Sequence, residues 1–99
     1  MTLRHIEKVR TMLKLAMGID VSYAYEDLIF PSHEDFLLRF DDEAPSNYYC
    51  HFHRDCSEAQ KKRLLASLEV ACRMHECTIT PRETFHLEPQ GDNVQVHFA

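Results

Sequence analysis

The chain has 99 residues, of which 44% are hydrophobic and 27% charged, and its formal net charge is −5. This length and composition are typical of a single globular domain over residues 1–99 and exclude an extended disordered segment. The acidic balance disfavours nucleic acid as the main partner, and the absence of an apolar run of about 18 residues predicts no membrane-spanning helix.

Residues 3–17 predict an amphipathic helix, because apolar side chains recur along one face of a 3.6-residue period. Gly18 then stands where a left-handed cap ends a helix. From Ile19 to Tyr25 the period changes to two, which predicts a half-buried strand in which Ile19, Val21, Tyr23 and Tyr25 share a face. The segment 28–30 follows and leads into a turn at Pro31 and Ser32.

The middle of the chain predicts two more strands and a second helix. The strand at 35–40 places Phe36, Leu38 and Phe40 on one face, and a third strand at 48–53 alternates Tyr48, Cys50 and Phe52 with Tyr49, His51 and His53. A capping-box pattern starts the helix near Ser57, and the helix runs to about His75. Residues 78–80 begin a short extended segment.

The C-terminal part predicts a β-hairpin. Phe85 and Leu87 alternate with polar residues, as do Val94, Val96 and Phe98, and a loop of about four residues, 89–92, separates the two runs. The resulting order is α-β-β-β-α-β-β. We therefore expect an α+β fold in which two helices pack on one face of a mostly antiparallel five-stranded sheet.

Charged residues interrupt the apolar pattern of the first helix, which argues against a signal peptide. We therefore expect a cytoplasmic protein whose four cysteines are reduced thiols. Cysteines and histidines cluster along the sequence in a way that invites a zinc hypothesis, at Cys50, His51, His53, Cys56, Cys72, His75 and Cys77. The alternation favours buried thiols instead, because Cys50 shares a face with Phe52 and Cys72 lies beside Leu68.

A second metal hypothesis rests on histidines alone. The strand pattern points His51, His53, His86 and His97 away from the apolar face, where they could bind zinc or another transition metal or respond to pH. The alternative is that an open sheet face simply needs polar residues. We expect no cofactor, and the alternative is zinc or another transition metal.

Catalytic signatures are scarce. The chain has two glycines, which excludes a glycine-rich phosphate-binding loop, and no serine lies in a nucleophile-elbow motif. One catalytic hypothesis is a thiol activated at Cys56, at the start of the second helix. We expect no enzymatic activity.

Apolar residues outside the predicted core faces indicate an interaction surface. Met12 and Leu15 lie away from the stripe of the first helix, and Val70 and Met74 form a weakly apolar side of the second. These four positions predict binding to a protein partner or self-association, for example as a dimer.

The order of elements resembles that of type III secretion chaperone-like domains, and the stretch 84–89 followed by 93–96 looks like the last hairpin of that family. The resemblance implies a dimer that binds an extended segment of a partner protein. The sequence therefore favours a small protein-interaction module, chaperone-like or self-associating. The alternative is a metal-binding or metal-sensing domain.

Overall fold

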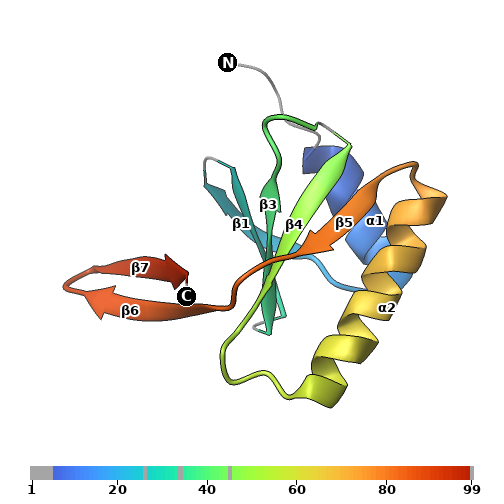
Figure 1. The fold of residues 1–99 in the computed structure, drawn as a ribbon. Coiled ribbons are helices and arrows are strands. Elements are labelled where there is room, and N and C mark those ends of the chain that lie inside the picture. Colours follow the sequence, from blue (N-terminus) through green and yellow to red (C-terminus); the bar gives the residue numbers. More distant parts are fainter. Residues whose placement is uncertain (1–5, 26, 34, 45, 99) are drawn as a thin grey trace.

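The computed structural model describes residues 6–25, 27–33, 35–44 and 46–98 (Figure 1). Leu3, which the sequence pattern assigns to the first helix, lies outside these ranges. The elements in chain order are α1 (Ile6–Met17), β1 (Val21–Tyr25), β2 (Leu28–Pro31), β3 (Phe36–Phe40), β4 (Asn47–Phe52), α2 (Glu58–Met74), β5 (Thr78–Pro81), β6 (Phe85–Gln90) and β7 (Asn93–Phe98).

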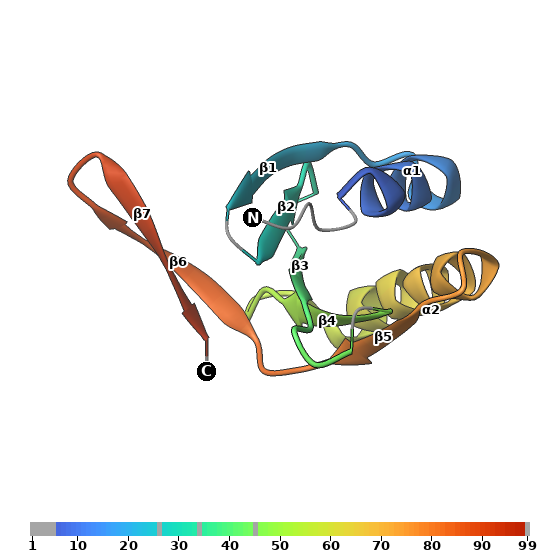
Figure 2. The same ribbon diagram turned by 90° about the horizontal axis from the view of Figure 1, so that it is seen from above.

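Strands β1 to β5 form one sheet in their chain order. The first three pairings are antiparallel, and β4 pairs with β5 in parallel. A parallel pair needs a long crossover connection, which α2 provides. Both helices lie on the same side of this sheet, and the β6–β7 hairpin projects from the other side (Figure 2). The predicted α+β class, with a mostly antiparallel five-stranded sheet, is therefore confirmed.

The membership of the sheet differs from the prediction. The two C-terminal strands were expected to belong to it, but they form a separate two-stranded sheet. The sheet instead contains β2, which the sequence pattern did not identify as a strand because a turn was expected at Pro31. It also contains β5, which ends at Pro81. The order is therefore α-β-β-β-β-α-β-β-β.

A register shift in β1 also corrects the expected alternation. It falls between Val21 and Tyr23, so that Val21 still packs on the core. Tyr23 and Tyr25 instead turn to the opposite face and are exposed. A β-bulge has this effect because one extra residue reverses the faces of all the residues that follow it.

The core lies between the helices and the inner face of the sheet, as alternation in β3 and β4 predicts. Phe36 pairs with Phe52, Leu38 with Cys50, and Phe40 with Tyr48, and all six side chains are buried. The helices contribute apolar side chains from one stripe each, namely Val9, Met12, Leu13, Leu64, Leu68, Ala71 and Cys72. Among the described residues, no helix has the length and apolar character needed to cross a membrane.

Both predicted helix boundaries are confirmed. Gly18 has a φ of +67° and donates its N–H to the Lys14 carbonyl at 3.0 Å, closing α1 with a left-handed cap. The Ser57 hydroxyl accepts a hydrogen bond from the Gln60 N–H at 3.2 Å, which caps the start of α2.

Met12 is the clearest correction to the expected helix faces. The sequence pattern places it away from the buried stripe, but its side chain is fully buried. Its sulfur lies among the thiols of Cys72 and Cys77, so that α1 reaches α2 through this contact. Leu15, in contrast, is 75% exposed.

Met12→Ala should therefore lower the free energy of unfolding by about 2–5 kcal/mol, because it leaves a cavity in the core. Leu15→Ala, one turn further along the same helix, should change it by less than about 0.5 kcal/mol. Urea unfolding followed by circular dichroism measures both. Equal effects of the two substitutions would contradict the assigned burial.

Candidate functional site

The predicted cysteine and histidine cluster is divided by the sheet. Cys50 faces the helices on the inner side of β4, whereas the next residue, His51, points to the opposite side, which we call the outer face. Neighbours in a strand point to opposite faces, so these two residues cannot bind one ion from the same side. The geometry therefore does not support a joint zinc site.

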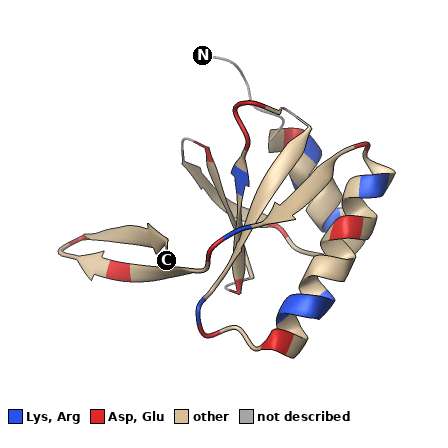
Figure 3. Cartoon of the chain, viewed as in Figure 1, with Lys and Arg blue, Asp and Glu red and all other residues tan. Residues whose placement is uncertain are grey.

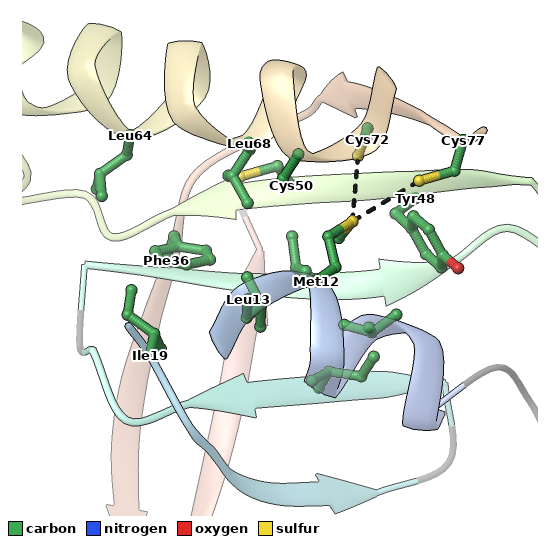
Figure 4. Close-up of a cluster of buried hydrophobic side chains, with 14 of the residues drawn as sticks. Met12, Leu13, Ile19, Phe36, Tyr48, Cys50, Leu64, Leu68, Cys72 and Cys77 are labelled. Carbon is green, nitrogen blue, oxygen red and sulfur yellow. Dashed lines mark hydrogen bonds between the residues drawn. The ribbon is translucent and has the colours of Figure 1, made fainter. Parts of the chain in front are cut away.

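The thiols belong to the core. The Cys72 and Cys77 sulfurs lie 3.8 and 3.7 Å from the Met12 sulfur (Figure 4). Burial raises the pKa of Cys72 to about 12, and a contact with Cys77 adds to this effect. Burial also raises the pKa of Cys50 to about 12. These thiols are protonated near neutral pH and behave as apolar groups.

The hypothesis of an activated thiol at Cys56 is not supported. A helix N-terminus lowers the pKa of an exposed thiol, but Cys56 is buried and burial raises its pKa. Its sulfur lies 3.7 Å from the Ser57 carbonyl oxygen, to which the S–H donates. A raised pKa leaves little thiolate to act as a nucleophile.

We expect iodoacetamide to leave Cys50, Cys56 and Cys72 unmodified in the native protein at pH 7, because each is buried and protonated. All four cysteines should react after unfolding in urea. Peptide mass spectrometry measures the labelling at each position. Rapid modification of native Cys56 would restore the hypothesis of a reactive thiol.

The outer face of the sheet carries a row of cross-strand neighbours. Tyr25 pairs with Leu28, Leu28 with Arg39, and Arg39 with Tyr49. The Arg39 guanidinium lies 4.9 Å from the centre of the Tyr49 ring and 5.8 Å from that of Phe98, near the end of the hairpin. The hairpin base is thus held against the outer face by stacking as well as by the backbone.

His51 is the buried polar residue at this junction. Its Nδ1 donates a hydrogen bond to the Glu83 carbonyl oxygen at 2.8 Å, since a carbonyl only accepts. Its ring lies 4.4 Å from the Phe98 ring, and its Nε2 is buried without a hydrogen-bond partner among the described residues. Burial lowers the pKa of His51, and the charges of Arg39 and Arg82 act in the same direction against the opposing effect of Glu83.

Acid should therefore destabilise the protein through His51. Below the usual pKa of 6.5, the unfolded chain takes up a proton on this imidazole that the folded chain does not. The free energy of unfolding consequently rises with pH in this range and falls as the solution is acidified through it. His51→Asn keeps an N–H donor but does not titrate, so its stability should fall less between pH 7 and pH 5.

Denaturant unfolding at several pH values measures this dependence. His51→Phe serves as a second variant, because it fills the site without a titrating group. Stability that falls as steeply in both variants as in the natural protein would contradict the role of His51.

The hairpin itself is held at its base. The Arg54 N–H donates to the Phe85 carbonyl oxygen at 3.0 Å, and the His53 ring meets the Phe85 ring edge-on at 5.3 Å. The connection at the tip is shorter than predicted, with β6 running to Gln90 and β7 starting at Asn93. Gly91 has a φ of +62°, which suits the first position of a two-residue hairpin turn.

The register of the hairpin gives it two different faces. Phe85 pairs with Phe98, Leu87 with Val96, and Pro89 with Val94, which forms an apolar row on one face. The histidine face is opposite and carries His86, Glu88, Gln90, Asn93, Gln95 and His97. Most of the apolar row is exposed, since Leu87 and Val94 retain 47% and 62% of their accessible surface.

Two of the four predicted metal-binding histidines come together. His86 and His97 are cross-strand partners whose rings stack with their centres 5.1 Å apart. Glu88 joins them, although the sequence prediction missed it, and its Oε2 lies 3.2 Å from His97 Nε2. The two-residue spacing from His86 was the signal that could have found it. His51 and His53 lie instead at the hairpin base.

The predicted interaction residues are dispersed. Met12 is buried and therefore cannot belong to an interaction surface. Leu15 lies on α1, while Val70 and Met74 lie one turn apart on α2, and all three are exposed. Several charged residues lie along α2, whereas the hairpin carries few (Figure 3). On the hairpin, in contrast, the exposed apolar residues Leu87 and Val94 belong to one row on one face.

No protein-family profile, curated protein or solved structure matches this chain. Its function must therefore be argued from the arrangement of its own side chains. The resemblance to type III secretion chaperone-like domains stays a prediction.

Proposed function

We propose that this chain is a protein-interaction module that self-associates through the hairpin β6–β7. The apolar row supports this proposal most directly. Phe85 and Phe98 pair at the hairpin base, where Phe85 is buried, but Leu87 and Val94 are exposed along the part that projects. Apolar side chains that alternate regularly along a strand are typical of a face that another surface covers.

The number of strands also supports a second copy as the partner. An isolated two-stranded hairpin is marginally stable in water, and three or more strands with an apolar face are needed for independent stability. Here β6 and β7 pair only with each other beyond the base, within the described strands. Two hairpins joined edge to edge make four strands.

The two edges of the hairpin differ in a way that selects β7. With a two-residue loop, Val94, Val96 and Phe98 direct their backbone groups outward on β7, as Pro89 does on β6. Proline has no N–H, so the outer edge of β6 is interrupted. Strand β7 contains no proline and no acidic or basic residue other than a histidine, and it therefore offers an intact edge.

Pairing of β7 with β7 of a second copy is compatible with twofold symmetry. A twofold axis perpendicular to the joined sheet leaves both apolar rows on the same face, where they form one larger surface. Charge does not oppose the contact, because the hairpin carries only two charged side chains, Glu88 and Asp92, and neither lies on β7. Symmetric dimers are also the commonest oligomers.

Val94→Glu should weaken the dimer by at least about tenfold, because the change places a charge in each of the two apolar rows that join on one face of the four-stranded sheet. Gln95→Glu adds the same charge to the neighbouring position on the histidine face and should have a smaller effect. Sedimentation velocity over a concentration series measures the association.

Val96→Pro provides a test of the edge itself, since it removes an outward N–H and leaves the pairing with β6 intact. We expect a monomer from this variant. A natural chain that stays monomeric at every concentration contradicts the proposal, as does a dimer that Gln95→Glu weakens as much as Val94→Glu.

A further inference from the structure

The histidine face of the hairpin carries a second feature that self-association does not use. His86, Glu88 and His97 each offer one ligand atom, and these atoms lie within 4.8 Å of one another. No other group of three or more potential ligands lies so close together among the described residues. We propose that these three residues form a binding site for a divalent transition-metal ion, with Zn²⁺ as its representative.

The donor set fits this class of ion. Two imidazoles and one carboxylate are ligands that zinc accepts with a fourth position left for water. Calcium and magnesium prefer oxygen ligands alone, so a site dominated by imidazole discriminates against them. The site is therefore expected to select ions such as Zn²⁺, Co²⁺, Ni²⁺ or Cu²⁺.

The distances are close to those that coordination requires. Ligand bonds of about 2.0–2.1 Å in a tetrahedron place neighbouring donor atoms about 3.3 Å apart. Glu88 Oε2 and His97 Nε2 are already separated by 3.2 Å. The third ligand atom, from His86, lies within 4.8 Å of the other two, and its ring stacks on that of His97.

The environment of His97 supports the same assignment. Its Nε2 is shielded from solvent and makes no well-directed hydrogen bond to any described residue, even though Glu88 is close. A buried ring nitrogen without a directed partner loses hydrogen-bonding free energy. A metal ion between the imidazole and the carboxylate supplies the missing partner.

The pairing of the two strands fixes the spacing between the three proposed ligands. His86 and His97 occupy opposite positions on two paired strands, and Glu88 follows His86 on the same face. An ion held by all three would join β6 to β7 and strengthen a hairpin that is otherwise marginal. Because the apolar row lies on the other face, this site does not depend on the proposed dimer.

Titration of the tag-free protein with ZnCl₂, followed by calorimetry, tests the site. We expect one ion per chain. His86→Ala, His97→Ala and Glu88→Gln should each weaken binding by at least about tenfold, the loss that removal of even an outer-shell partner causes at metal sites. His33→Ala, which alters a histidine on a different part of the chain, is the matched control and should leave the affinity unchanged.

Two further measurements identify the ligands. Ring-nitrogen chemical shifts of His86 and His97 should change on addition of Zn²⁺, and exchange of the backbone amides of Glu88 and Gln95, which point into the hairpin, should slow. The titration is repeated on Val94→Glu, so that loss of the dimer is distinguished from loss of the site. Absence of saturable binding overturns the proposal, and so does an adventitious ion only, recognised by equal weakening in His33→Ala.

Discussion

The pairing of β3 with β4 is the constraint on which the rest of the structure depends. Their inward side chains form three apolar pairs that both helices cover, and their outward side chains include Arg39 and His51, which contact Phe98 of the hairpin. Since side chains alternate strictly in a strand, one register determines both surfaces. A slip of one residue would expose the core row and bury Arg39 and Tyr49, so the hydrophobic effect and the cost of burying charge select the same alignment.

This two-sided arrangement separates the chemistry of the chain into layers. The four cysteine sulfurs lie in the interior, where a thiol acts as a small apolar group. The imidazoles of His51, His53, His86 and His97 lie on or beyond the outer face, where they can donate, accept or bind a metal. Adjacent residues in the sequence, such as Cys50 and His51, consequently have unrelated roles. The hairpin is divided in the same way, because its apolar row lies on one face and its potential metal ligands on the other.

The sequence predicted those parts of the fold that depend on local periodicity and on capping. The Ser57 cap, the Gly18 cap and the alternation in β3 and β4 follow from neighbouring residues and were correctly expected. The placement of β5 beside β4 and the separation of the hairpin from the sheet depend on contacts between distant segments, which periodicity does not reveal. The bulge in β1 has no sequence signal of its own, and for this reason Tyr23 was assigned to the wrong face. At the candidate site, His86 and His97 were expected on one surface, but Glu88 was missed because a single acid in a polar strand is unremarkable until its cross-strand neighbours are known. Met12 was misplaced because the buried stripe of α1 widens where it meets the sulfurs of Cys72, in α2, and Cys77, which follows α2.

Pro89 has a consequence that reaches beyond one molecule. An exposed strand edge recruits further strands, and a sheet with two receptive edges can grow without limit into a fibril. In the hairpin, a single residue without an N–H interrupts the outer edge of β6, while β7 remains receptive. A chain that joins through one edge reaches a closed assembly after a single addition. A proline on the other edge would therefore limit such an assembly to a dimer and prevent growth into a polymer.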